Sequence, residues 1–148
     1  YHHTEIGYNY RMSNVLAAIG VGQMEAIEDR IKRTREVNQI YRKEVGNLFY
    51  SFQEERNTDR SNMWLTCAIM KGEYKPEDLI DHLAKDNIEG RRLWKPMHEQ
   101  PVMKGYKKYI NGNSSLLFLQ GICLPSGSDL TDSDMKRIIK SIKTFFKK

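Results

Sequence analysis

A helical pattern runs from Ser13 to Gly46 near the start of the chain. Ser13 is a suitable N-cap residue and Gly46 is a natural stop. A helix of roughly thirty residues, at a rise of about 1.5 Å per residue, is about 45 Å long. That length is too great for a chain of 148 residues to cover with its own core. We therefore expect this helix to project from the rest of the chain toward another structure.

The two halves of this helical pattern differ in composition. Residues 15–22 are apolar on every side and rich in small side chains, whereas the part after Glu25 is amphipathic and highly charged. We expect the first half to be buried between neighbouring elements and the second half to be exposed on one face. Where no neighbour covers residues 15–22, their apolar surface predicts self-association through this segment.

Short apolar segments follow, and their length is that of β-strands. Residues 53–62 are polar and without a period, which indicates a loop. Pro96 and Pro101 confine the stretch around them to loop geometry. We expect strands at residues 63–70 and 88–94. We expect residues 113–124 to begin as a short helix and to end as a third strand.

Two further helices have clear boundaries. Pro76 suits the first turn of a helix that continues to about Asp86. Thr131 is a suitable N-cap for the last helix, and Asp134 stands three residues later, where it completes a capping box. The alternation of helices and strands predicts an α+β fold in which helices pack on a small sheet of about three strands.

This order of elements also predicts how the chain is organised. Residues 1–46 form a linking segment and the long helix, and residues 47–148 form a small α+β domain. Charged residues make up 29% and hydrophobic residues 39%, a balance typical of soluble globular proteins. No apolar stretch reaches the roughly 18 to 20 residues that cross a bilayer, and residues 1–5 lack the features of a signal peptide. We expect a cytoplasmic protein with no membrane partner.

The net charge of +5 raises the question of nucleic-acid binding. Basic residues are scattered among acidic ones, and the densest cluster, formed by Lys104, Lys107 and Lys108, is short. We therefore expect a solvated basic surface and no nucleic-acid partner, although an anionic small molecule such as a nucleotide fits the charge equally well.

Two cysteines, Cys67 and Cys123, lie inside apolar runs and have no companion at metal-ligand spacing. We expect two buried thiols rather than a disulfide or a zinc site. His82 stands beside Leu79 and Leu83 in a predicted helix, as an ordinary partly buried histidine would. No metal site is predicted.

The sequence has no Ser/His/Asp set and no glycine-rich phosphate loop, so these patterns alone indicate only a soluble α+β domain. Residues 3–25, with the sequence HTEIGYNYRMSNVLAAIGVGQME, closely resemble the DegT/DnrJ/EryC1/StrS family of sugar aminotransferases. In that family, a G-x-N-x-R-M-S motif stands at the start of a long helix, and a G-Q-L/M-E motif stands at its end. Residues 91–98 (RRLWKPMH) and 121–127 (GICLPSG) resemble the same family, in the same order. We treat His2 and His3, where this match begins, as native residues rather than a tag.

This resemblance implies the C-terminal portion of a fold-type-I aminotransferase that uses pyridoxal phosphate and acts as a homodimer. Such enzymes move an amino group from glutamate to a keto sugar carried on a nucleotide. The Trp-Lys-Pro-Met-His phrase at residues 94–98 resembles the branch acting on 4-keto-6-deoxy-N-acetylhexosamines in polysaccharide or glycan precursor synthesis. The family's Schiff-base lysine precedes the position of Tyr1, so the resemblance implies no catalytic residue in this chain. The chain alone is expected to be inactive and colourless.

Asn9 matches a family asparagine that reaches across the dimer to the cofactor phosphate. Its side-chain amide can donate to a phosphate oxygen, and the alternative is a turn residue next to Gly7. Arg11 either helps hold the same anion or forms an ion pair near the start of the helix.

The resemblance also points to Arg91, Trp94, Lys95 and His98 as contacts to the sugar nucleotide. Lys95 offers a charge for a diphosphate, and His98 offers an imidazole for a sugar hydroxyl. The alternative for Trp94 is a place in the core. Two other readings of the chain stay open: a non-catalytic interaction or structural domain derived from this fold, and a small basic nucleic-acid binder.

Overall fold

In the computed structural model, which describes residues 6–147, the long helical pattern forms two helices rather than one. α1 spans Asn14–Glu25 and α2 spans Ile27–Val45, and they meet at Ala26, where φ is −106° and ψ is 2°. Ser13 caps α1 as predicted, because its side chain accepts the Leu16 N–H at 3.3 Å. The prediction of one continuous helix is wrong at Ala26. Alanine is the strongest helix former, so its propensity gave no warning of a break.

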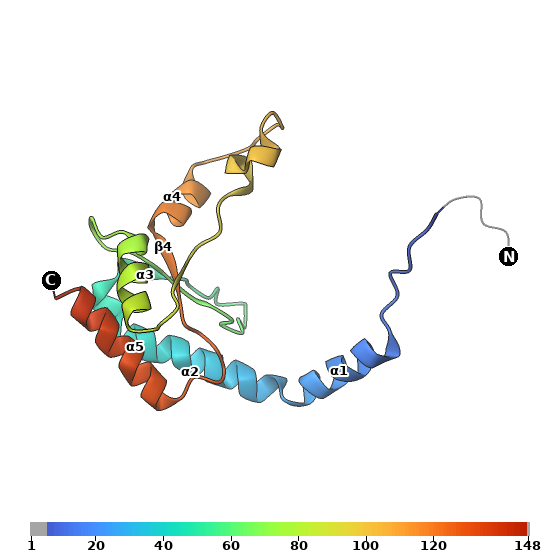
Figure 1. The fold of residues 1–148 in the computed structure, drawn as a ribbon, viewed down its shortest axis with the longest axis horizontal. Coiled ribbons are helices and arrows are strands. Elements are labelled where there is room, and N and C mark those ends of the chain that lie inside the picture. The colour runs from blue at the N-terminus through green and yellow to red at the C-terminus, as the bar shows by residue number, and fades with distance from the viewer. Residues whose placement is uncertain (1–5, 148) are drawn as a thin grey trace.

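α1 extends away from the rest of the chain, as the length of the pattern predicted. Figure 1 shows α1 and the extended segment before it, in blue, leading away from the body of the structure at the N-terminal end of α2. No residue of α1 is buried, and Ile19 is 55% exposed. The expectation that residues 15–22 are buried between neighbours is therefore wrong within a single chain. Within residues 6–147, no helix or strand covers these apolar residues.

A four-stranded antiparallel sheet, in the order β1-β2-β4-β3, forms the centre of the fold. The prediction of about three strands omitted the edge strand β1, which is only two residues long and lies just before the predicted polar loop. The strand expected within residues 88–94 is present but short. The strands are β1 (Ser51–Phe52), β2 (Thr66–Ile69), β3 (Arg91–Arg92) and β4 (Gly121–Leu124).

The remaining helices confirm the predicted boundaries. The capping box of the last helix is complete, since the Thr131 hydroxyl accepts the Asp134 N–H and the Asp134 carboxylate accepts the Thr131 N–H. Short 3₁₀ turns follow α2 and occupy the proline-containing stretch. These elements are α3 (Pro76–Lys85), α4 (Asn113–Gln120) and α5 (Asp132–Phe145), with η1 (Gly46–Leu48), η2 (Met97–Glu99) and η3 (Pro101–Met103).

The core lies between one face of the sheet and α2, α3 and α5. Along β2, Thr66 and Ala68 are buried while Cys67 and Ile69 are partly exposed. This alternation shows that helices cover one face of the sheet and leave the other more open. Each fully buried aliphatic side chain in such a core contributes about 1.5 to 3 kcal/mol relative to an exposed one. The core residues include Val37, Tyr41, Leu79, Leu83, Ile122, Leu124, Ile138 and Ile142.

Candidate functional site

β3 and the segment after it carry four of the predicted site residues. Arg91 and Arg92 are adjacent in β3, so their side chains point to opposite faces of the sheet. The Arg92 guanidinium forms an ion pair with Glu77 and stacks on the Phe118 ring, with 4.2 Å from Cζ to the ring centre. Arg91 is exposed and pairs with Glu89 at 2.8 Å. Arg92 therefore has a structural role, and Arg91 is the arginine that faces solvent.

Trp94 lies on the surface, 67% exposed, so the alternative that it belongs to the core is wrong. Its ring centre is 6.5 Å from that of Trp64, which is 68% exposed. The two ring planes are tilted by 37°, so each exposed indole offers its own face to an aromatic or sugar ring. Sequence reasoning missed Trp64, because it lies within a run that was expected to form a buried strand. A groove of about 630 Å³ adjoins Trp64 and is lined by α2 and residues 126–129.

His98 lies in an arm, residues 95–112, that projects from the sheet between β3 and α4 (Figure 1). Its Nε2 atom is 3.2 Å from the Ser115 Oγ and 3.6 Å from a Glu99 carboxylate oxygen, and its carbonyl oxygen accepts from Lys108 Nζ at 2.9 Å. A hollow of about 310 Å³ beside His98 is also lined by Lys107. The imidazole is therefore held by Ser115 beside a hollow that Lys107 and Lys108 also line, and it can bond a hydroxyl-bearing ligand.

The Lys95 side chain is exposed near the base of the same arm. The backbone carbonyl oxygen of Lys95 accepts a hydrogen bond from Gln100 Nε2 at 3.5 Å. This contact does not involve the ammonium group of Lys95. The structure thus places Arg91, Trp94, Lys95 and His98 on one continuous segment.

Asn9 and Arg11 lie elsewhere, in the exposed segment that precedes α1. The Arg11 N–H donates to the Asn9 Oδ1 at 3.0 Å, a local turn contact that agrees with the turn alternative for Asn9. This contact uses only the oxygen of the Asn9 side-chain amide. The Nδ2 atom of the same amide is the donor that a phosphate would need, and this contact leaves it available. Figure 1 shows this segment well apart from the arm, so one chain does not bring the two groups together.

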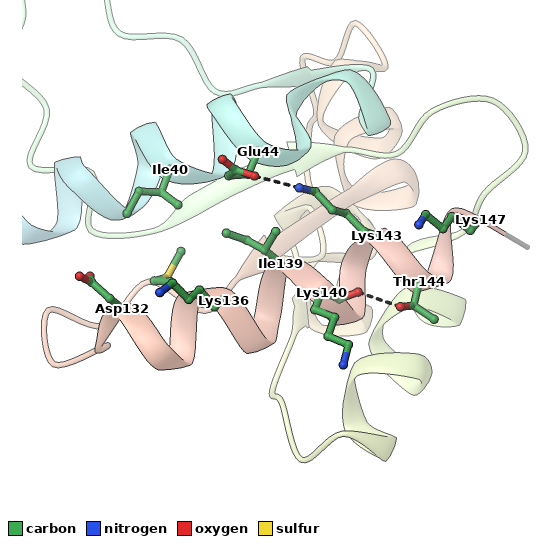
Figure 2. Close-up of a pocket in the computed structure, with 10 residues that line it drawn as sticks. Ile40, Glu44, Asp132, Lys136, Ile139, Lys140, Lys143, Thr144 and Lys147 are labelled. Atoms are coloured by element: carbon green, nitrogen blue, oxygen red, sulfur yellow. Dashed lines mark hydrogen bonds and ion pairs between the residues drawn. The ribbon is translucent and has the colours of Figure 1, made fainter.

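A separate groove of about 710 Å³ lies between α2 and α5 (Figure 2). Its apolar floor includes Ile40 and Ile139, and lysines of α5 line it. Lys143 Nζ pairs with Glu44 at 2.8 Å and lowers the pKa of that carboxyl group below its ordinary value. None of the predicted site residues lines this groove.

Within residues 6–147, no three His, Cys, Asp or Glu side chains lie in an arrangement that would hold a metal ion. In the same part of the chain, no helix combines the length and the apolar character needed to cross a membrane.

Comparison with known proteins identifies the family. The model of the DegT/DnrJ/EryC1/StrS aminotransferase family matches residues 1–143. EpsN of Bacillus subtilis (strain 168), named provisionally as a pyridoxal phosphate-dependent aminotransferase, is 38% identical over 99% of this chain. The GDP-perosamine synthase of Escherichia coli O157:H7 is 35% identical, also over 99% of the chain. The chain spans about 40% of the length of these curated relatives, 39% of the first and 40% of the second.

Solved structures show the same fold at low sequence identity. A DegT/DnrJ/EryC1/StrS aminotransferase from Brucella abortus matches 100% of this chain and 39% of its own, with a TM-score of 0.84 and 22% identity. PseC of Helicobacter pylori, an aminotransferase involved in the biosynthesis of pseudoaminic acid, matches 99% of this chain and 40% of its own, with a TM-score of 0.84 and 17% identity. This chain belongs to the DegT/DnrJ/EryC1/StrS aminotransferase family.

Proposed function

We propose that this chain is the C-terminal part of a pyridoxal phosphate-dependent enzyme that moves an amino group from glutamate to a nucleotide-linked keto sugar. The observation that carries the proposal is the family match over residues 1–143, which includes every candidate site residue. The relative named GDP-perosamine synthase makes a nucleotide-linked amino sugar, in agreement with this class of reaction. In this proposal residues 1–46 link the small domain, residues 47–148, to the rest of a longer protein in the cytoplasm.

Pyridoxal phosphate supplies the electron sink for amino transfer when it is bound. The residues before α1 fit its phosphate chemically, because Asn9 Nδ2 is a neutral donor and Arg11 carries a guanidinium in an exposed backbone segment. This segment and α1 extend away from their own chain (Figure 1). We therefore assign Asn9 to the cofactor phosphate of a second subunit and propose a homodimer as the active form.

The arm and the open face of the sheet form the proposed sugar-nucleotide site. The Trp94 indole, paired with Trp64, offers a stacking surface for a base or a sugar ring. Lys95 and Arg91 carry charges that match a diphosphate, and His98, held by Ser115, can bond a sugar hydroxyl. The substrate proposed from the Trp94 to His98 phrase is a 4-keto-6-deoxy-N-acetylhexosamine on its nucleotide, for polysaccharide or glycan precursor synthesis.

No lysine of this chain is assigned to the chemical step. We propose that the lysine that binds the cofactor belongs to the part of the longer protein that this chain does not span, and that residues 1–148 alone are inactive. The shares of the curated relatives that the chain spans, 39% and 40%, support this division.

The test is an amino-transfer assay on the longer protein that contains this chain. Purified protein is incubated with glutamate and either a UDP-linked 4-keto-6-deoxy-N-acetylhexosamine or a GDP-linked 4-keto-6-deoxyhexose, and mass spectrometry detects the amino sugar. Amination of the N-acetylated sugar is the expected result. Amination of the GDP-linked sugar alone would retain the aminotransferase and reject the substrate, and amination of neither would reject both.

Single substitutions test the assigned residues in the same assay. Lys95→Ala and His98→Ala remove hydrogen bonds to the ligand, each with an expected loss in kcat/KM of roughly tenfold or more. Lys32→Ala, an exposed lysine of α2, is the matched control and should leave kcat/KM unchanged. Equal behaviour of the site variants and this control would contradict the placement of the sugar-nucleotide site.

A further inference from the structure

The two central strands of the sheet place the only two cysteines of the chain opposite each other. Cys67 of β2 and Cys123 of β4 are register partners, and their Sγ atoms are 3.7 Å apart. The sequence predicted two thiols without a disulfide, and both thiols are free in the structure. The pairing could not be read from the sequence, because the cysteines stand 56 positions apart along the chain.

The backbone around these cysteines favours a bond between them. Cys67 uses its N–H and its carbonyl oxygen toward Gln53, which follows β1, so it makes no ladder hydrogen bond toward Cys123. Opposite residues in such a non-hydrogen-bonded pair have Cα atoms about 4.5 Å apart. Disulfides span Cα distances of roughly 4.4 to 6.8 Å, so the sulfurs can join with only a small movement.

The surroundings of the pair favour the thiolate form of one of the two sulfurs. Cys67 is half-buried and Cys123 is 6% exposed, and both lie on the more open face of the sheet. The hydrogen bond from the Cys67 thiol, together with the positive charge of Arg91, holds the pKa of Cys123 below its ordinary value. The same interaction, together with burial, raises the pKa of Cys67. The pair can thus share a single proton, and the thiolate is the form that reacts.

We propose that Cys67 and Cys123 form a dithiol site that peroxides oxidise to a reversible intramolecular disulfide. One thiolate attacks hydrogen peroxide: an S–O bond forms, the O–O bond breaks, and hydroxide leaves to become water. The second sulfur then attacks the sulfenic sulfur: the S–S bond forms, the S–O bond breaks, and a second water leaves with the thiol proton. Two thiols and one peroxide give one disulfide and two waters, and two electrons pass from sulfur to oxygen. This inference is independent of the proposed amino transfer.

Mass spectrometry of the folded chain tests the proposal. After treatment with one equivalent of hydrogen peroxide, the intact chain should lose two hydrogens, and proteolysis should yield a single linked peptide that contains Cys67 and Cys123. Dithiothreitol should restore the original mass. Separate sulfinic or sulfonic acids on the two cysteines, disulfide-linked dimers, or unreacted thiols would each overturn it.

The single variants Cys67→Ser and Cys123→Ser are the matched controls. Each keeps one thiol in a nearly isosteric background, so neither should lose two hydrogens, and the remaining sulfur should stop at a sulfenic acid or be oxidised further. An equal loss of two hydrogens in either variant would contradict the pairing.

Phenylarsine oxide provides a second measurement that does not require an S–S bond. This trivalent arsenical binds two nearby thiols with release of one water, and an isolated thiol does not retain it. Wild-type chain should bind one equivalent and lose its reaction with maleimide, while both single variants should lose the retained arsenic. Failure of the wild-type chain to retain one equivalent would show that the two sulfurs do not act together.

Discussion

Tyr41 is a fully buried side chain of α2 whose hydroxyl donates to the Pro125 carbonyl oxygen at 2.9 Å. This hydrogen bond ties α2 to the segment that follows β4. Burial raises the pKa of Tyr41 above its ordinary value, because the phenolate would lose its hydration inside the core. The free energy of unfolding should therefore fall as the pH rises into the alkaline range.

Tyr41→Phe should lower the free energy of unfolding at pH 7 by about 1 to 3 kcal/mol, since the Pro125 carbonyl oxygen loses its buried partner. The pH dependence follows from the raised pKa. Unfolded Tyr41 ionises near pH 10, so its contribution is fully present below that pH and is lost as the pH rises toward the folded value. Between about pH 10 and pH 11, the wild-type chain should lose up to about 1.4 kcal/mol more than the variant.

Urea unfolding at a series of pH values measures this difference. Tyr50→Phe is the matched control, because Tyr50 is 77% exposed and should show neither the loss at pH 7 nor a change in the alkaline slope. Parallel pH profiles for wild-type and Tyr41→Phe would show that Tyr41 does not carry this dependence.

The family resemblance singled out Trp94, Lys95 and His98, which stand close together in the sequence, but it did not show the surface around them. Trp64 was missed because it stands in a run that was expected to form a strand, and the Cys67–Cys123 pair was missed because it depends on the register of β2 and β4. The strand pairing and its register cannot be read from one sequence.

The capping box at the start of α5 is the clearest local sequence signal for a helix boundary in this chain. The Thr131 hydroxyl accepts the Asp134 N–H at 3.1 Å, and the same hydroxyl donates to the Asp134 carboxylate at 2.6 Å. Thr131→Ala should lower the free energy of unfolding by about 1 kcal/mol, because the first turn of α5 loses its cap.

Ser133→Ala is the matched control for this prediction in the same first turn. Ser133 is exposed and lies just before Asp134, so its loss should change the free energy of unfolding by less than about 0.5 kcal/mol. Thermal or urea unfolding distinguishes the two variants, and an equal loss in both would argue against the cap as the cause.

The elements with local signals were predictable, and those fixed by distant contacts were not. Pro76 and Thr131 mark helix starts with their own side chains, so α3 and α5 begin where the sequence predicted. β1 and β3 are two residues each and exist only because β2 and β4 offer them partners. The break at Ala26 has no proline or glycine to announce it.

The exposed apolar surface of α1 determines the self-association that we expect of the whole molecule. Because Leu16 and Ile19 are exposed on a helix with no buried residue, we predict that the chain self-associates through residues 15–22. Light scattering over a concentration series should show a mass that rises with concentration, and Ile19→Lys should reduce that rise.

Gln23→Lys adds the same charge on α1 outside residues 15–22, and it should leave the self-association unchanged. A monomer at every concentration of the wild-type chain, or an equal effect of the two lysine variants, would contradict this role of α1.

Absorbance spectroscopy with pyridoxal phosphate tests whether this chain is part of an enzyme that uses this cofactor. The chain is extended upstream along its own reading frame to include the lysine expected by the family, and spectra are recorded before and after glutamate is added. We predict that the extended protein retains the cofactor with a visible absorbance band that shifts with glutamate, while residues 1–148 alone stay colourless. An upstream region without that lysine, and no retained band, would contradict the aminotransferase account and favour a non-catalytic domain of the same fold.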